Sequence, residues 1–310
     1  IDEATGVITV AEGAVLDYET TLPDHKITLL VEVTDRGTEP QIATVVVTLT
    51  DENEPPEIID DGLDYEVVEN TVPGTEIARY EIKDVDAIDA NFATSLVVSL
   101  TDNASHTVKA QNLFETVVKT EGGKTYAVLQ VKSDLDFEDV FNKNADSLFN
   151  VTITLKDQQG VAGCNTVTLQ KKITVRDDNE APVILETPIY TVKENSAAET
   201  SVGKVDADDE DIWSELTFKL VNIQGEGDVA SLFKIDNNGN ITVAANANLD
   251  YETKNEYRVK VVVTDNGSSK GFTDLSDSVI ITIQVTDEDE KPGFDDKYPT
   301  FSVYENSKAG

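Results

Sequence analysis

Short runs that alternate between hydrophobic and polar residues recur along the whole chain. Residues 256–264 place an apolar side chain at every second position, and residues 149–155 and 279–285 repeat this pattern. A period of two is typical of a β-strand with one face against a core. Gly, Asn and Asp separate these runs, and no long stretch shows a helical period. The pattern predicts an all-β fold of Greek-key sandwiches.

Four short motifs recur in the same order and at nearly the same spacing. The Leu-Asp-aromatic-Glu motif begins at Leu16, Leu135 and Leu249, which are 119 and 114 residues apart. A Glu-Asn pair, an Asp followed closely by Gly, and an acidic string that ends at Pro share this period. The period exceeds the roughly 20–50 residues of solenoid repeats and indicates an array of whole domains.

These motifs set the domain boundaries that we expect. Residues 1–10 parallel residues 235–243, which lie in the second half of a repeat, so the sequence opens partway through one. The predicted order is the C-terminal half of a repeat at 1–50, a linker at 51–56, a complete repeat at 57–176, a linker at 177–182, a complete repeat at 183–286, a linker at 287–292 and the start of a further repeat at 293–310.

One interval in the second repeat is longer than its counterpart. Glu138 and Asp157 are 19 positions apart, whereas Glu252 and Asp265 are 13 apart. The extra residues, 139–148, therefore predict a loop or a short helical excursion.

Composition narrows the class of protein. The formal charge is −36, from 60 acidic and 24 basic residues, so nucleic acid and anionic membrane surfaces are unfavourable partners. Hydrophobic residues make up 39% of the chain in short β-branched runs, which argues against disorder. No run approaches roughly 18 apolar residues, so no membrane span is expected within this sequence. The single Cys164 excludes an intrachain disulfide.

The acidic strings supply the candidate chemistry. They occupy residues 51–56, 177–182 and 287–292, and each directly follows a strand-like run. Carboxylates at this density repel one another unless cations lie between them. Hard oxygen ligands favour Ca²⁺, and weak extracellular modules bind it at roughly 10⁻⁴–10⁻³ M. The strings therefore predict calcium linkers in an extracellular protein.

The motifs, in this order, resemble the extracellular cadherin repeat, and the resemblance covers essentially the whole chain. It implies seven-stranded sandwiches in an elongated rod, with about three calcium ions at each complete junction. It also implies a calcium-dependent cell–cell adhesion protein of the cell membrane, with a single-pass anchor outside this sequence. The partner would be another cadherin, the same or different, bound through repeats that can lie outside this sequence.

The resemblance carries calcium ligands over residue by residue. Ligands of the first junction would be Asp17, Glu19, Asp51, Glu52, Asn53, Glu54, Asp84, Asp86, Asn91 and Asp157. Those of the second would be Glu69, Asp136, Glu138, Asp177, Asp178, Asn179, Glu180, Asp206, Asp208 and Asp265. Those of the third would be Glu194, Asp250, Glu252, Asp287, Glu288, Asp289 and Glu290. Only the second set is complete, so fewer ions are expected at the other two.

Other interpretations remain open at this point. The acidic strings could be solvated connectors, or each Asp-x-Glu pair an acid–base pair, but such pairs recur once per repeat whereas an active site occurs once. We therefore do not expect an enzyme. A heterophilic receptor or mechanical tether, and a prokaryotic cadherin-like surface module, are alternatives to homophilic adhesion. Sequons that permit glycosylation begin at Asn103, Asn150, Asn240 and Asn266.

Overall fold

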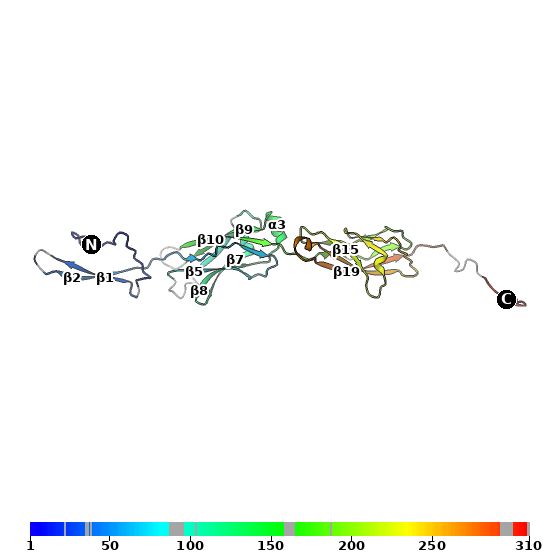
Figure 1. Cartoon of the computed structure of the whole chain (residues 1–310), viewed down its shortest axis with the longest axis horizontal. Helices are drawn as coiled ribbons and strands as arrows, with labels where there is room; N and C mark the ends of the chain where they lie inside the picture. The colour runs from blue at the N-terminus through cyan, green and yellow to red at the C-terminus, as the bar shows by residue number, and fades with distance from the viewer. Residues whose placement is uncertain are drawn as a thin grey trace. The chain divides into compact units, whose positions relative to one another are not determined.

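The computed structural model describes residues 1–21, 23–34, 37, 39–86, 96–102, 104–157, 165–186, 188–291 and 300–308. Almost all regular structure in these residues is β-strand (Figure 1). The chain divides into two compact units, Ile1–Asp178 and Asn179–Gly310. Among the helices in these residues, none is long and apolar enough to cross a membrane.

The first unit opens with residues 1–50, for which the sequence predicts half a repeat. Two strands there, β1 (Lys26–Val33) and β2 (Gln41–Thr48), pair antiparallel, with Leu29 opposite Val45. Apolar side chains such as Leu30 and Ile42 remain exposed on this hairpin.

The complete repeat of the first unit consists of two facing sheets. One sheet has the order β4 (Tyr65–Val68), β10 (Thr166–Arg176), β9 (Leu148–Lys156) and β6 (Val97–Asp102). The other has the order β3 (Glu57–Ile58), β5 (Glu76–Lys83), β8 (Lys124–Val131) and β7 (Phe114–Glu121). Because β3 and β4 belong to different sheets, the segment between them crosses the sandwich. Strand β4 pairs parallel with β10, and the other pairs in these sheets are antiparallel.

Within the described residues of this repeat, two short helices interrupt the strands, α2 (Ala110–Leu113) and α3 (Phe137–Asn144). Helix α3 confirms the helical excursion predicted from the long interval. The Asp136 side chain caps it by accepting from the Asp139 N–H at 2.5 Å, and the helix ends at Ala145, which has a left-handed φ of 64°. The cap matters for the site, because Asp136 is one of the predicted ligands.

The second unit contains the other complete repeat, with the same strand order. Its first sheet is β12 (Tyr190–Lys193), β19 (Ser276–Thr286), β18 (Glu256–Thr264) and β15 (Thr217–Val221), again with a parallel first pair. The facing strands are β13 (Ser201–Lys204), β17 (Asn240–Val243) and β16 (Phe233–Ile235), and a further short pair joins β11 (Val183–Ile184) to β14 (Ala207–Asp208). Single turns of 3₁₀ helix, η1 (Val229–Ser231) and η2 (Gly267–Lys270), complete it.

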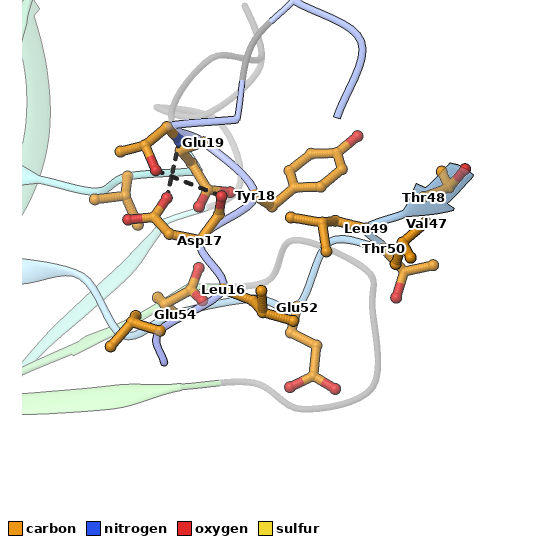
Figure 2. Close-up of a pocket in the computed structure, with 13 residues that line it drawn as sticks. Leu16, Asp17, Tyr18, Glu19, Val47, Thr48, Leu49, Thr50, Glu52 and Glu54 are labelled. Atoms are coloured by element: carbon orange, nitrogen blue, oxygen red, sulfur yellow. Dashed lines mark hydrogen bonds between the residues drawn. The ribbon is translucent and has the colours of Figure 1, made fainter. Parts of the chain in front are cut away.

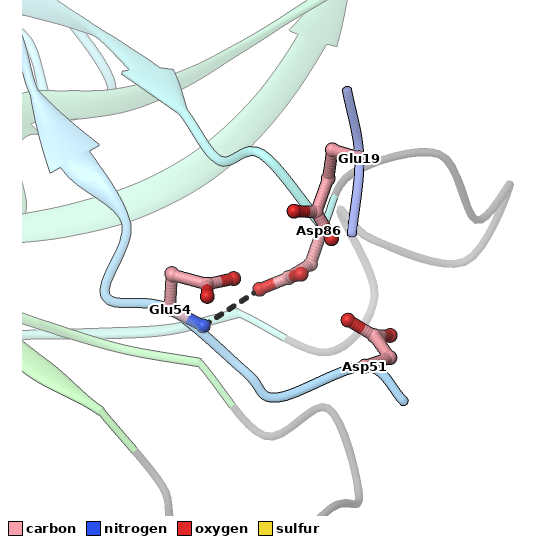
Figure 3. A group of neighbouring side chains, drawn as sticks. All are labelled: Glu19, Asp51, Glu54 and Asp86. Carbon is pink, nitrogen blue, oxygen red and sulfur yellow. Dashed lines mark hydrogen bonds between the residues drawn. The ribbon is translucent and has the colours of Figure 1, made fainter. Parts of the chain in front are cut away.

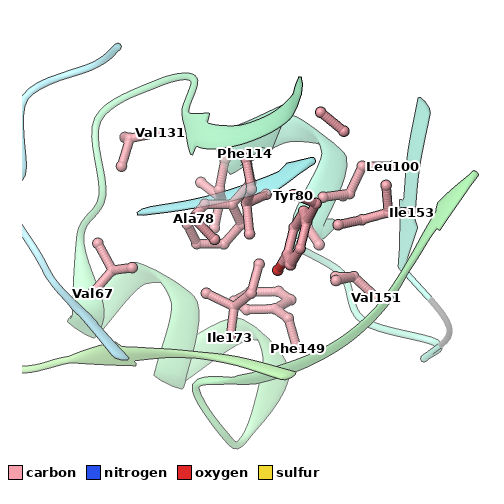
Figure 4. Close-up of a cluster of buried hydrophobic side chains, with 14 of the residues drawn as sticks. Val67, Ala78, Tyr80, Leu100, Phe114, Val131, Phe149, Val151, Ile153 and Ile173 are labelled. Carbon is pink, nitrogen blue, oxygen red and sulfur yellow. The ribbon is translucent and has the colours of Figure 1, made fainter. Parts of the chain in front are cut away.

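Each complete repeat has its own hydrophobic core between its sheets. In the first unit Tyr80, Phe114, Phe149 and Ile153 are fully buried and gather in the sandwich interior (Figure 4). Phe233, Ile241, Val259, Val261 and Ile283 form the corresponding core of the second unit. These are the alternating positions of the strands, so the all-β sandwich prediction is confirmed.

Candidate metal centres

The Glu-Asn motif near the start of each complete repeat contacts the Leu-Asp-aromatic-Glu motif of the same repeat. Asn70 and Asn195 take a left-handed backbone, with φ of 57° and 53°. Asn tolerates this conformation better than most residues, which accounts for its recurrence in the motif. Their backbone N–H groups donate to the carbonyls of Leu135 and Leu249, both at 3.0 Å. The Glu-Asn motif is thereby joined to the Leu-Asp-aromatic-Glu motif.

The glutamate of this motif holds two segments at once. Glu69 accepts from the Phe137 N–H at 2.6 Å and, with its other carboxylate oxygen, from the Asp178 N–H at 2.8 Å. Glu194 repeats the arrangement and accepts from the N–H groups of Tyr251 and Glu288 at 2.9 and 2.8 Å. Both glutamates are buried. We call each a glutamate clamp, because it ties the linker to the Leu-Asp-aromatic-Glu motif.

The first junction brings together four acidic side chains from separate segments. One carboxylate oxygen from each of Glu19, Asp51, Glu54 and Asp86 lies within 4.8 Å of the others. Figure 3 shows these side chains converging, with the Glu54 N–H donating to Asp86 Oδ2 at 2.9 Å. Within the described part of the chain, none of the four forms an ion pair with a basic residue. Two like charges at that distance repel by roughly 3 kcal/mol at an effective dielectric constant of about 20.

The electrostatics of this group favour a cation. Partial desolvation, and then the negative charges of Asp86, Glu19 and Asp51, raise the pKa of Glu54. Burial raises the pKa of Asp84, and the charges of Asp86 and Asp157 add to this effect. The buried atoms Asp84 Oδ2 and Asp86 Oδ1 accept no hydrogen bond from the residues that the structure describes. Hard oxygen donors that lack hydrogen-bond partners match the ligand preference of Ca²⁺.

A hollow beside this group contains further predicted ligands (Figure 2). Its lining includes Asp17, Glu52 and Glu54 together with the apolar side chains of Leu16 and Leu49. Asp17 is oriented there by the Thr20 N–H, which donates to its carboxylate at 2.8 Å. The Asp17 and Glu52 carboxylates thus lie near the first group without being members of it.

A buried aspartate positions the linker asparagine in each complete repeat. Asp157 is fully buried, and its Oδ2 accepts from Asn53 Nδ2 at 3.1 Å. In the second unit Asp265 Oδ2 accepts from Asn179 Nδ2 at 2.9 Å, and its Oδ1 accepts from the Gly267 and Leu275 N–H groups at 3.0 and 2.9 Å. Because each aspartate binds the amide nitrogen of its linker asparagine, it fixes the orientation of that side chain, including its carbonyl oxygen.

Gly267 is required for this arrangement, because a Cβ there would lie 2.5 Å from Asn179 Oδ1 and 2.7 Å from the Thr273 carbonyl. We expect Gly267→Ala to lower the free energy of unfolding of the repeat 183–286 by about 1–3 kcal/mol. Calcium-free denaturant unfolding measures this, with Gly37→Ala as the control since nothing lies within 4 Å of its added Cβ. An unchanged denaturation midpoint for Gly267→Ala would contradict the packing argument.

Two further acidic groups lie within single units. Carboxylate oxygens of Glu69, Asp136 and Glu138 lie within 4.8 Å of one another in the first unit. Burial raises the pKa of Glu69, and the charges of Asp177 and Asp136 raise it further. The hydrogen bonds from the Phe137 and Asp178 N–H groups lower it, but they do not cancel the effect of burial. In the second unit the group is Glu194, Glu252, Asp287 and Glu290, also within 4.8 Å. Desolvation, and then the charges of Glu194 and Glu252, raise the pKa of Glu290.

The remaining predicted ligands of the third junction lie outside its group. Asp250 accepts from the Thr253 N–H at 2.9 Å, Glu288 forms an ion pair with Lys193, and Asp289 is exposed. At the first junction, Asn91 falls outside the described residues.

The third repeat differs from the prediction at its Asp-x-Asp pair. Asp206 is exposed and forms an ion pair with Lys204, and Asp208 is the exposed last residue of β14. Strand pairing sets Lys83 opposite Glu57 in the first unit and Asp208 opposite Val183 in the second. Thus Asp209 and Asp211 lie in the strand register where Asp84 and Asp86 lie in the first unit, three residues beyond the predicted pair, and calcium binding by Asp206 and Asp208 stays a prediction. The overlooked signal is the alternation before each pair, since Tyr80 and Ile82 correspond to Val205 and Ala207.

The chain is similar in sequence to several known proteins. A family model for the cadherin domain matches residues 188–286. Protocadherin Fat 1 of Homo sapiens is 30% identical over 279 residues, which cover 88% of this chain and 5% of that protein. Cadherin-23 of Mus musculus is 29% identical over 323 residues, which cover 100% of this chain and 9% of that protein. The chain therefore spans only a small part of the curated relatives that it matches.

A solved structure supports the fold. The extracellular cadherin domains 1–5 of protocadherin gamma B2 superpose with a TM-score of 0.54 and 23% identity, over 88% of this chain and 48% of that chain. At this identity the likeness concerns the fold alone. It agrees with the tandem β-sandwich repeats described above.

Proposed function

The chain belongs to the cadherin superfamily, and from this premise we propose that it is an ectodomain segment of a calcium-dependent cell–cell adhesion protein. In this proposal the acidic linkers bind calcium and stiffen the junctions between repeats, outside the cell. Superfamily membership also confirms that the chain is not an enzyme.

The observation that carries the proposal is the group at the first junction. Glu19 comes from the half repeat, Asp51 and Glu54 from the linker, and Asp86 from the following repeat, and their oxygens lie within 4.8 Å. A bound calcium ion would supply the positive charge that lets these carboxylates stay close. Held together by one ion, the three segments could no longer move independently, which is the physical basis of the proposed stiffening.

The other two junctions offer the same donor chemistry. Glu69, Asp136 and Glu138 would bind calcium at the second junction, and Glu194, Glu252, Asp287 and Glu290 at the third. The glutamate clamps orient two of these ligands before any ion binds. The number of ions at each junction is part of the proposal, with about three expected at the second.

Calcium titration by calorimetry, combined with small-angle scattering, tests the proposal. Calorimetry should show that several calcium ions bind the whole chain. Scattering should show that chelation shortens the maximum dimension and broadens the distribution of interatomic distances. A magnesium solution of equal ionic strength is the control, since screening alone also weakens carboxylate repulsion. Identical scattering with and without chelator would contradict the stiffening, and an absence of calcium uptake would contradict the proposal altogether.

The partner is proposed to be another cadherin, either the same protein or a different one. Beads coated with this chain separate the two cases when mixed in calcium. Self-aggregation supports homophilic adhesion. Dispersed beads that still bind calcium favour a heterophilic receptor or a mechanical tether.

A further inference from the structure

We propose that the outward face of the β1–β2 hairpin binds the same face of a second copy of this chain. The proposal rests on the proposed function, because it identifies where the partner of an adhesion protein would bind. Its basis is a group of aliphatic side chains on that face, Leu30, Ile42 and Val46, which are 72%, 65% and 53% exposed. We call this group the aliphatic patch.

The three side chains of the patch are neighbours on one face of the hairpin. Strand register sets Leu30 opposite Thr44, so Ile42 and Val46 lie diagonally on either side of Leu30. Diagonal neighbours across two strands are roughly 7–8 Å apart, which long side chains bridge. Single exposed aliphatic residues are common on protein surfaces, whereas a contiguous group is the kind of surface that a partner covers.

The patch lies on the face of the hairpin that points away from the core. Ile27, Leu29 and Val31 alternate with the outward residues of β1 and are partly buried. When the Thr-Asp pairs that follow the strands are aligned, Val31 corresponds to Val261, which is fully buried in the repeat 183–286. A sandwich core therefore forms against the opposite face, and the patch stays exposed.

Both complete repeats have polar side chains at the positions that correspond to the patch. Counting back from the Asp that follows each strand gives the correspondence, and strand pairing agrees with it. Leu30 corresponds to Thr152 and Lys260, Ile42 to Thr168 and Ser278, and Val46 to Lys172 and Thr282. The sandwich fold thus forms without aliphatic side chains there, so the patch serves a purpose other than folding.

Two charged residues on the same face indicate that a second copy fits. Lys26 and Glu32 are exposed and lie at the two ends of the outward row of β1, with Leu30 between them. A two-fold axis that runs between the two faces, perpendicular to the strands, places the Lys26 end of one copy over the Glu32 end of the other. The face is therefore complementary to itself in charge as well as apolar at its centre.

The association is expected to be weak, because the patch is small and specific interfaces of small area are weak. A dissociation constant of about 0.1–1 mM corresponds to such a contact. Many copies on two apposed surfaces would engage together, and this multivalency raises the overall strength without any new contact.

Sedimentation of the whole chain in millimolar calcium tests the patch. We expect the triple variant Leu30→Thr, Ile42→Thr, Val46→Thr to weaken self-association at least about tenfold, because the variant removes the apolar area that the contact buries. Threonine is well tolerated in strands, so the hairpin should still fold. The control is Ile280→Thr, which removes an exposed aliphatic side chain from the outward face of the repeat 183–286 and should change nothing. Equal effects of the two changes would overturn the assignment of the patch.

Charge reversal tests the two-fold arrangement. Lys26→Glu and Glu32→Lys each place like charges opposite one another, so each variant alone should associate at least about threefold more weakly. An equimolar mixture of the two variants should associate as the wild type does, because both contacts of a mixed pair then join opposite charges. Net charge alone would instead make the less acidic Glu32→Lys chain associate more strongly than the wild type. A mixture no stronger than its components would overturn the arrangement.

Calorimetry and circular dichroism of the same samples separate this proposal from the proposed function. A folded wild-type chain that binds calcium but remains monomeric up to about 1 mM would overturn the contact between copies while the calcium proposal stands. The patch would then belong to a contact with a different protein. Self-association through the patch without calcium uptake would overturn the proposed calcium dependence alone.

Discussion

Calcium affinity is expected to fall by about tenfold or more when the pH is lowered from 7 to 5. The pKa values of Glu54, Asp84, Glu69 and Glu290 are all raised in the calcium-free protein. Protons therefore compete with calcium at a higher pH than they would for ordinary carboxyls. Each group that must release a proton on binding lowers the affinity by up to about tenfold per pH unit below its pKa.

The stability of the calcium-free protein should change in the opposite direction. A carboxyl whose folded pKa is raised binds more protons in the folded than in the unfolded chain, so stability increases as the pH falls from neutral through the raised pKa values toward about 4. Thermal unfolding at pH 7 and pH 5, with calcium and with chelator, measures both trends. A calcium-induced increase in melting temperature that is as large at pH 5 as at pH 7 would contradict the coupling.

Replacing Asp60 and Asp61 together with Asn is expected to destabilise the repeat 57–176 by about 3–5 kcal/mol. Both carboxylates bind the Lys171 ammonium, Asp61 at 2.8 Å, and the Leu63 carbonyl accepts from it at 2.9 Å. The Lys171 side chain is only 3% exposed. Burial opposes its charge, but the hydrogen bonds to Asp60 and Asp61 outweigh this and raise the pKa of Lys171. Without them a charged lysine would remain buried and unpaired.

The opposite change should be much milder. Lys171→Met leaves two carboxylates that are 44% and 37% exposed and can be hydrated, so we expect a change within about 1 kcal/mol. The second unit supports this, because strand register places the buried Ile281 where the first unit has Lys171. Denaturant unfolding of a double-variant cycle provides the measurement. Failure of Lys171→Met to restore stability in the Asp60/Asp61 background would contradict this account.

The pH range of this ion pair follows from its own pKa values. Burial tends to raise the pKa of Asp61, but hydrogen bonds from Lys171 and Tyr65 overcome this and hold it at about 2. A lowered carboxyl pKa contributes stability above the unfolded value of about 4, and this contribution is lost as the pH falls toward 2. The pair therefore remains intact over the range in which calcium and protons compete at the junctions.

Much of the fold follows from local pattern. Alternation predicts the strands, and a count of residues between Glu138 and Asp157 predicts the excursion that forms α3. The recurring motifs identify the linkers because each motif is local and copied in every repeat. What local pattern does not reveal is which distant groups bind one another, as with Glu69 and the Asp178 N–H or Lys171 and Asp61.

The register of the aspartate pair in the repeat 183–286 was difficult to predict for a similar reason. Asp206, Asp208, Asp209 and Asp211 all lie within a single acidic run, and spacing between motifs varies by more than three residues from repeat to repeat. Only the pairing of β11 with β14 determines which aspartates follow the strand end. The alternation of Val205 and Ala207 with polar residues also indicates where the strand ends. This alternation covers only a few residues, and the Asp-x-Asp pattern at Asp206 and Asp208 is the more obvious signal.

The parallel pairing of β4 with β10 also has a mechanical consequence. Ile173–Arg176 lie beside Tyr65–Val68, so a strand near the start of the repeat is hydrogen-bonded to the last strand of the repeat. Pulling the two ends of the repeat apart would slide these strands past each other and load all of their hydrogen bonds together, instead of opening them one at a time. The β12–β19 pair has the same geometry. Each complete repeat is thus built to resist tension along the chain.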